Sequence, residues 1–487
     1  MVSIFKLGIK SRVSFLLLIP LLFGIYFLPD FILFLVFGMV VLTVLHTAFQ
    51  LKWAMKTYKK PNFRTLIHFP KISIHIPTHN EPAEVVIRTI KSCLSLDYPN
   101  YEIIIMDNNT TDRRLWEPVQ RFCEQHSRIK FCHVEKLSGY KAGALNKCME
   151  LTDPLAKYVF VVDADYMLSP DSLHRAVGIA QGEKAMLVQF PQSYVYEESL
   201  AGMNEEYNHY FKAFARGSNR SKSMLSTGTL SLYCIDALKN VGGWKTSSIT
   251  EDAEIAIKFH EKNFKSVYAD ILIGQGLLPS TLTDMRVQRE RWAFGNMQCL
   301  LNLAFQKKVP FIKKCDIAIQ LTAWINFLGF SLLTLLGLLI IFPFYEIRLF
   351  YPIIYMIGLN IGCYMAGKFF LFGITTKFYS QLHFQAFFTH MSMLDVHTFS
   401  WWDSLIGLKK PFQRTNKFFK DNSESVLPIG LALLMAMAGV ILIIKGYLPL
   451  GYTFIVFASI NYMGINLLAH QLFRTTGFYS KLNTAKP

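Results

Sequence analysis

Four short polar motifs occur in one order along the chain, and each contains residue types that could take part in chemistry. A pair of carboxylates after an apolar strand can bind a divalent cation, and a later acidic residue can act as a base. An Arg-Trp pair can hold a phosphate and a sugar ring. The combination predicts transfer of a sugar from a nucleoside diphosphate. The motifs are Asp163-Ala164-Asp165, Thr250-Glu251-Asp252, Gln288-Arg289-Glu290-Arg291-Trp292 and Phe412-Gln413-Arg414-Thr415-Asn416-Lys417.

The first motif predicts a metal site. Asp163 and Asp165 follow an apolar strand expected over residues 158–162. Two carboxylates this close repel each other unless a cation or hydrogen bonds offset their charge. Mg²⁺ or Mn²⁺ on a diphosphate would do so, whereas the alternative is a loop that carries two acidic residues without a ligand.

The second and third motifs fall on expected helices. Asp252 lies just before a periodic helix over residues 253–259, so it could be a general base or could cap the helix N-terminus. Gln288, Arg291 and Trp292 share a helix face through their i, i+3, i+4 spacing. Arg291 would then stabilise a leaving diphosphate and Trp292 would stack on a sugar. The alternative is a salt bridge for Arg291 and a core position for Trp292.

The elements that must position these residues alternate between residues 71 and 300. Short β-rich runs at 72–76, 101–106, 158–162 and 185–190 are separated by helical stretches at 82–95, 140–150 and 170–181. This alternation predicts an α/β domain with a doubly wound, mostly parallel sheet. Ligands bind at the carboxyl ends of the strands in such sheets, where Asp107 and Asp163 stand.

Apolar segments on both sides of this domain predict an integral, multi-pass membrane protein. The chain has 487 residues, of which 52% are hydrophobic, and six spans are expected in 13–51, 319–342, 350–373, 426–445 and 448–470, the first divided at Leu28-Pro29-Asp30. Residues 377–408 are amphipathic and aromatic, which predicts a helix on the membrane surface, with a tilted seventh element as the alternative. The net charge of +16 arises mainly beside apolar segments, which places the middle domain and both termini in the cytosol and gives no indication of nucleic-acid binding.

We therefore divide the chain into six regions. They are two transmembrane helices (1–60), a cytosolic catalytic domain with interface helices (61–318), transmembrane helices 3 and 4 (319–376), an amphipathic helix with a loop (377–425), transmembrane helices 5 and 6 (426–472) and a cytosolic tail (473–487). The eight cysteines show no CxxC pair, so neither a zinc site nor a disulfide framework is expected.

The motifs, taken together over residues 71–420, resemble the family 2 glycosyltransferases of the cellulose synthase type. The resemblance is carried by the four motifs, by Asp107 and by the strings Ile-Pro-Thr-His-Asn-Glu-Pro at 76–82 and Gly-Tyr-Lys-Ala-Gly-Ala-Leu-Asn at 139–146. It implies a GT-A fold, a divalent cation, inversion at the anomeric carbon and β-linked products. The 139–146 string is closer to plant mannan and xyloglucan-backbone synthases, and Ser226 to Thr229 depart from the Phe-Cys-Gly-Ser pattern of cellulose synthases.

The resemblance also assigns roles to individual residues. It makes Asp252, with Glu251 beside it, catalytic, and Asp163 and Asp165 the metal ligands. Residues 412–417 match a gating loop that folds over the nucleotide, except that Arg414 replaces Val; a basic juxtamembrane loop is the alternative. The implied nucleotide-sugar contacts are Pro77, Thr78, Asn80, Glu81, Asp107, Lys141, Asp163, Gln288, Arg291, Phe412, Thr415 and Lys417. The implied acceptor contacts are Trp292, Gly228, Thr229 and Asp252.

These expectations describe a processive, inverting polysaccharide synthase in the inner or plasma membrane. It would use UDP-glucose, extend a β-glucan acceptor and pass the polymer across the bilayer. The alternatives are a mannan synthase that uses GDP-mannose, an enzyme that adds a single sugar to a membrane lipid, and a non-catalytic transporter or scaffold. Polar residues within the spans would line the polymer path, namely Trp324, Asn326, Asn360, Tyr364, Asn461 and Asn466.

Overall fold

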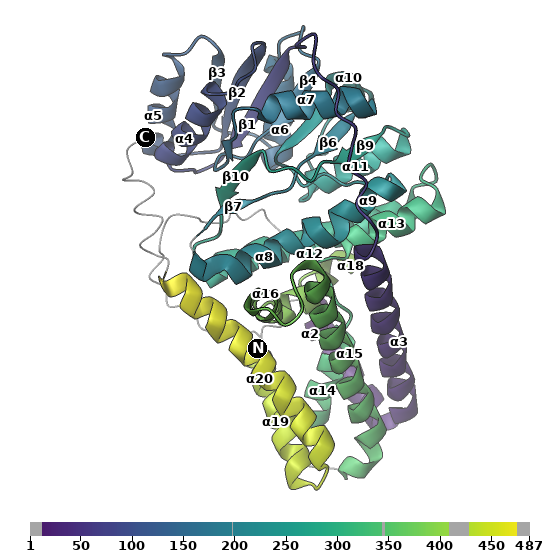
Figure 1. Cartoon of the computed structure of the whole chain (residues 1–487). Coiled ribbons are helices and arrows are strands. Elements are labelled where there is room, and N and C mark those ends of the chain that lie inside the picture. The colour runs from purple at the N-terminus through teal and green to yellow at the C-terminus, as the bar shows by residue number, and fades with distance from the viewer. Residues whose placement is uncertain (1–11, 197, 343–345, 409–427, 475–487) are drawn as a thin grey trace.

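The computed structural model describes residues 12–196, 198–342, 346–408 and 428–474. A globular α/β domain forms one end of the molecule and a bundle of apolar helices forms the other (Figure 1). Two helices, α8 (Ala201–His209) and α12 (Leu282–Phe305), lie across the boundary between the two parts. The third motif, which lies on α12, is therefore close to the apolar helices.

The central sheet has seven strands in the order β3-β2-β1-β4-β8-β6-β9. Their bounds are β1 (Ile72–Thr78), β2 (Tyr101–Asn108), β3 (Ile129–Val134), β4 (Tyr158–Val161), β6 (Leu187–Gln189), β8 (Ser231–Cys234) and β9 (Ser266–Tyr268). The four strands expected from the sequence are present, and β1 pairs in parallel with both β2 and β4. A second sheet joins β5 (Met167–Leu168), β10 (Gly274–Leu277) and β7 (Tyr194–Val195).

Four of the six strand pairings are parallel, as expected, and the sheet is mixed because of one antiparallel strand. Strand β8 runs antiparallel to both of its neighbours, β4 and β6. The chain reaches β8 from the boundary helices α8, η2 (Tyr210–Ala215) and α9 (Arg216–Ser221). It therefore enters the sheet without the covering helix that a parallel crossover needs.

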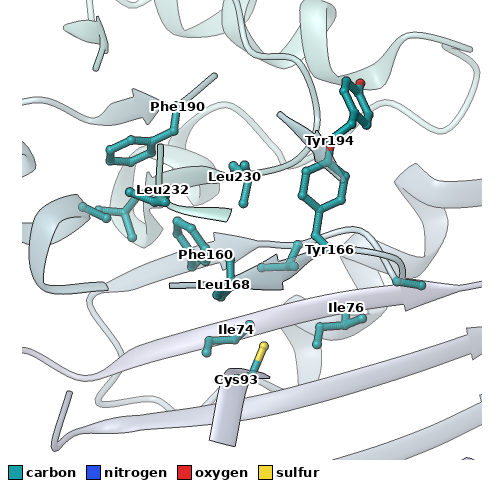
Figure 2. Packing of buried hydrophobic residues seen from close by; sticks show 14 of the residues in the cluster. Ile74, Ile76, Cys93, Phe160, Tyr166, Leu168, Phe190, Tyr194, Leu230 and Leu232 are labelled. Atoms are coloured by element: carbon teal, nitrogen blue, oxygen red, sulfur yellow. The ribbon is translucent and has the colours of Figure 1, made fainter. Parts of the chain in front are cut away.

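Helices cover both faces of the sheet, which explains the continuous apolar runs of the inner strands. Alternate residues of β1 and β4, such as Ile74 and Phe160, pack on the side of α4 (Ala83–Leu94) and α7 (Ser172–Glu183). Figure 2 shows Ile74, Phe160 and Cys93 meeting in this core. Val159 and Val161 point to the opposite side, toward α6 (Tyr140–Leu151) and α11 (Glu251–Glu261).

Three described helices are long and apolar enough to cross a membrane, namely α3 (Pro29–Ala54), α15 (Tyr351–Thr375) with the preceding turn, and α20 (Leu448–Arg474). Three others are apolar but shorter, namely α2 (Arg12–Phe27), α14 (Gly329–Ile341) and α19 (Gly430–Ile444). The break between α2 and α3 falls at Leu28, beside the proline that suggested it.

One expectation for the helical part needs correction, and a second stays a prediction. The run 319–342 is not one helix, because α13 (Phe311–Leu321) ends before a non-helical stretch that leads into α14. The segment 377–408 forms α16 (Gln381–Met391), α17 (Leu394–Phe399) and α18 (Trp402–Leu405), whose side chains are largely buried. This segment packs against α8 and the long helices, and its position at a membrane surface stays a prediction.

Candidate active site

A cleft opens at the carboxyl edge of the sheet, where β1, β2 and β4 end. It encloses ≈ 1170 Å³ of empty space, open solvent included. Helices α11 and α12 and the segment around Thr227 close its other side. Its lining includes Pro77, Thr78, His79, Glu81, Asn108, Lys141, Asp163, Asp165, Thr227, Thr250, Glu251, Asp252, Gln288, Arg291 and Trp292. The structure thus brings together most residues that the sequence singled out.

Two hydrogen bonds hold the acidic pair in place. The backbone N–H of Asp163 donates to Thr229 Oγ1 at 2.9 Å, and the Leu277 N–H donates to Asp165 Oδ2 at 3.1 Å. Asp165 is buried, whereas the Asp163 side chain is 34% exposed and faces the cleft. Carboxylate oxygens on one wall of this cleft suit a hard divalent cation, so the two side chains fit Mg²⁺ or Mn²⁺.

Lys141 links the acidic pair to the loop around Gly228. Its Nζ donates to Asp163 Oδ1 at 2.5 Å and to the Gly228 carbonyl at 2.8 Å. Burial acts to lower the pKa of Lys141, but the charges of Asp163 and Glu251 outweigh it and raise this pKa above the ordinary value. Lys141 therefore carries a fixed positive charge at the place where a diphosphate would arrive.

Glu251 and Asp252 begin α11 and face the same cleft. The Ala253 N–H donates to Asp252 Oδ1 at 2.9 Å, a local contact of the capping type. Burial raises the pKa of Asp252, and the Lys141 charge opposes this effect. Burial and the Asp252 charge raise the pKa of Glu251 to about 7. A carboxylate whose pKa is raised toward neutrality is a more effective proton acceptor than an ordinary surface Asp.

Gly228 lies close to Asp252 and Lys141, and its backbone has a conformation that favours glycine. Its φ is +83°, and a Cβ placed on it would lie 3.1 Å from Asp252 Oδ2 and 3.3 Å from Lys141 Nζ. Gly228 is absent from the cleft lining. Because it has no side chain, the Asp252 carboxylate and the Lys141 ammonium group can lie close to its backbone.

The helix face predicted from the third motif is present, because Gln288, Arg291 and Trp292 all line the cleft. Gln288 Oε1 accepts a hydrogen bond from Tyr207 Oη at 2.5 Å. The Trp292 ring meets Tyr207 edge to face at 5.9 Å and lies 5.8 Å from the ring of Trp324. Trp292 is therefore packed on one side and open to the cleft on the other.

An aromatic pocket of ≈ 590 Å³ adjoins the cleft on the side of the apolar helices. Six residues belong to both spaces, so the Asp252 carboxylate lies at their junction; they are Asp252, Thr250, Thr227, Trp292, Gln192 and Tyr194. In addition to these shared residues, the pocket is lined by Tyr207, Tyr210, Phe211, Leu225, Ser226, Ala253, Asn296, Gln320, Leu321 and Trp324. Flat apolar rings interspersed with amides are suited to the faces and hydroxyls of a sugar.

Several predicted contacts do not face the cleft. Asp107 is buried; Thr78 and Thr110 donate to its Oδ1 at 2.9 and 2.8 Å, and His133 Nδ1 lies 2.7 Å from its Oδ2. Asn80 and Thr229 are also outside the lining, and Thr229 acts through its bond to Asp163. Phe412, Thr415 and Lys417 lie outside the described residues, so the gating loop stays a prediction.

A second group with metal-ligand chemistry lies behind the aromatic pocket. Glu206, His390 and His397 are all buried, and their ligand atoms lie within 4.8 Å of one another. Glu206 is already paired with Arg289, and His390 Nε2 lies 3.1 Å from the Tyr364 hydroxyl. A divalent ion would meet the buried Arg289 charge there, so the acidic pair of the cleft offers the more favourable ligands for a cation.

Most of the residues expected in a polymer path are buried between elements. Asn360 donates to Ser331 Oγ at 2.8 Å and Asn461 donates to the Met391 carbonyl at 2.7 Å, both across helices. Asn466 donates to the carbonyl of Tyr462 in its own helix. The polymer path therefore stays a prediction, and helix-to-helix bonding accounts for Asn360 and Asn461.

The comparisons with known proteins agree with this fold. A mannosyltransferase from Pyrobaculum calidifontis, solved in complex with GDP-Man and Mn²⁺, matches with a TM-score of 0.51 and 17% identity over 69% of this chain and 96% of that one. This likeness defines the sheet domain as GT-A-like. The profile of Glycosyl transferase family 2 matches residues 73–242 and that of Glycosyl transferase family group 2 matches residues 158–367. Residues 73–367 of the chain therefore form a family 2 glycosyltransferase region.

Several curated relatives are plant proteins. The probable glucomannan 4-beta-mannosyltransferase 9 of Oryza sativa subsp. japonica is 32% identical over 263 residues, 50% of this chain and 49% of that protein. Glucomannan 4-beta-mannosyltransferase 7 of Arabidopsis thaliana is 30% identical over 250 residues, 49% of this chain and 45% of that protein. The chain spans about half the length of the curated relatives that it matches.

Proposed function

We propose that this protein is a membrane-embedded, inverting mannosyltransferase that uses GDP-mannose and extends a β-linked polysaccharide. The single observation that carries the proposal is the junction at Asp252, where a polar cleft with an acidic pair meets an aromatic pocket. A donor in the cleft and a sugar acceptor in the pocket would both reach this carboxylate. GDP-mannose thus replaces UDP-glucose as the preferred donor, and a mannan replaces β-glucan as the preferred product. The reason is that the curated relatives above are glucomannan mannosyltransferases.

In this proposal the donor diphosphate lies between the acidic pair and α12. Asp163 and Asp165 would hold a divalent cation, which supplies positive charge against the diphosphate when it is bound. Lys141 and Arg291 line the same cleft and add two fixed positive charges there. These charges favour the leaving nucleoside diphosphate over the intact donor, since negative charge develops on it during transfer.

The acceptor sugar would stack against Trp292 with its reacting hydroxyl toward Asp252. Asp252 would take the proton of this hydroxyl, and the oxygen would attack the anomeric carbon from the side opposite the diphosphate. Gly228 leaves Asp252 room to do so, because a side chain there would press on the carboxylate. The pKa of Glu251 is also raised, so near pH 7 Glu251 and Asp252 together carry less negative charge than two ordinary carboxylates would.

The proposal places the sugar-transfer domain in the cytosol. The end of α3 that faces this domain is followed by a basic run, whereas the far end begins with Pro29 and Asp30. Positive residues beside a span favour the cytosolic side. The basic residues are Lys52, Lys56, Lys59 and Lys60.

A panel of nucleotide sugars tests the proposal directly. The full chain in lipid nanodiscs would be incubated with radiolabelled GDP-mannose, UDP-glucose or UDP-GlcNAc, with Asp252→Asn as the matched inactive control. We expect a polymer from GDP-mannose that β-mannanase degrades. A β-glucanase-sensitive polymer from UDP-glucose would restore the glucan interpretation, a single sugar on a lipid would support the lipid alternative, and no transfer from any donor would refute the proposal.

A further inference from the structure

Arg289 lies at the centre of the aromatic residues that join the cleft to the pocket. It is fully buried, and its guanidinium carbon lies 4.0 Å from the ring centroid of Tyr207, 4.5 Å from that of Trp292 and 3.9 Å from that of Trp324. Cations over aromatic faces are attracted by the ring quadrupole, most strongly where water is excluded. Arg289 therefore fixes three rings relative to one another.

The charge of Arg289 is neutralised from the side away from the pocket. Its Nη2 is paired with Glu206 of α8, and Glu206 Oε1 lies 3.2 Å from His390 Nδ1 of α16. Its Nε and Nη1 have no hydrogen-bond acceptor among the residues that the structure describes. A buried guanidinium with unpaired N–H groups is unfavourable unless the surrounding rings compensate for it. The burial of Arg289 and its incomplete hydrogen bonding thus indicate that its contacts with the aromatic rings matter as much as its ion pair with Glu206.

All three rings, those of Tyr207, Trp292 and Trp324, line the aromatic pocket beside Asp252. From this geometry we infer that Arg289 is a positioning residue for the acceptor: it holds Trp292 and Trp324 at the angle at which a sugar can stack on them. The inference rests on the proposed function, since it assumes that the pocket receives an acceptor sugar. Arg289 is absent from the lining of both spaces, so it acts through the rings.

Lysine cannot replace arginine in this position. A planar guanidinium can lie against several ring faces and still pair with a carboxylate, whereas an ammonium group is a compact point charge. Arg289→Lys keeps the charge partner of Glu206 but loses the planar contact with the rings. The double variant Glu206→Gln/Arg289→Gln removes both charges and so leaves neither buried and unpaired.

The same helix offers a matched control. Arg286 lies one turn before Arg289 on α12, is also buried, and pairs with Asp395 of α17 through both Nη atoms. Arg286 lines neither the cleft nor the pocket. Arg286→Lys therefore perturbs a buried Arg–carboxylate pair of α12 without changing the rings.

The test measures donor and acceptor constants separately, with GDP-mannose and soluble β-linked manno-oligosaccharides, on the full chain in nanodiscs. For Arg289→Lys we expect the acceptor KM to rise tenfold or more and products to become shorter, while the donor KM and acceptor-free donor hydrolysis stay within twofold. The double Gln variant should show the same split, and Arg286→Lys should lower thermal stability without changing the acceptor KM.

Other results would refute either the positioning role of Arg289 or the proposed function. If Arg289→Lys or the double variant changes donor and acceptor constants equally, or leaves the acceptor KM unchanged, Arg289 is not a positioning residue. A rise in the acceptor KM of Arg286→Lys as large as that of Arg289→Lys would reduce the effect to general loss of helix packing. Absence of transfer by the unmodified protein would instead refute the proposed function, so the two failures are distinguishable.

Discussion

Replacing Gly228 with alanine tests whether the distance between Asp252 and the loop matters for catalysis. The residue has φ +83°, and the added Cβ would lie 3.1 Å from Asp252 Oδ2, 3.3 Å from Asp252 Cβ and 3.3 Å from Lys141 Nζ. These distances are shorter than ordinary van der Waals contacts, so Asp252 or Lys141 must move by a few tenths of an ångström. A misplacement of roughly 1 Å at a reacting group costs about a hundredfold in rate. We therefore expect kcat to fall roughly tenfold.

The left-handed backbone of Gly228 adds a stability cost of about 1–2 kcal/mol for a residue with a Cβ. Gly242→Ala is a matched control, because Gly242 has φ +76° but no described atom lies within 4 Å of its added Cβ. Both variants should lower the thermal midpoint, while only Gly228→Ala should lower kcat at saturating donor. Equal kcat values for the two variants would refute the idea that Gly228 leaves room for the base.

Three further predictions concern the metal, the base and pH. Excess EDTA should abolish transfer and Mn²⁺ or Mg²⁺ should restore it; full activity of Asp163→Asn or in EDTA would contradict the metal assignment. Asp252→Asn should leave nucleotide binding intact, measured by calorimetry, and lower transfer by roughly a hundredfold or more; a near-normal rate would move the base elsewhere. Because the pKa of Glu251 is raised from 4.5 to about 7, the folded chain keeps a proton in this window that the unfolded chain has released. The free energy of unfolding should thus fall by up to about 3 kcal/mol as pH rises from 4.5 to 7, and Glu251→Gln should remove this part of the pH dependence in thermal melts. An unchanged slope in Glu251→Gln would show that Glu251 has an ordinary pKa.

Local patterns made much of the sheet domain predictable. Apolar runs bounded by turn residues indicated β1, β2, β4 and β6, because strands buried on both faces have no polar alternation. The spacing of Gln288, Arg291 and Trp292 indicated a shared helix face, and all three side chains line the cleft.

Features that depend on contacts between distant residues were missed. Arg289 and Glu206 are separated by 83 positions, and nothing in the local sequence of either predicts their pairing. The antiparallel strand β8 is only four residues long, so its apolar pattern is too short to show direction. Asp107 stands at the end of β2 as expected, but its burial comes from Thr78, Thr110 and His133, which lie on other elements or later in the chain.

Helix α12 belongs to more than one hydrophobic core. Leu282 and Met285 near its start pack in the core of the sheet domain, whereas Ala293 and Met297 pack with the apolar helices of the bundle. In the opposite direction, Leu468 of α20 reaches the sheet-domain core. The sheet domain and the bundle consequently share the packing around α12, and a chain cut at residue 318 would lose part of it. The arrangement of the bundle helices thus helps to set where α12 lies, and with it the width of the cleft that α12 lines.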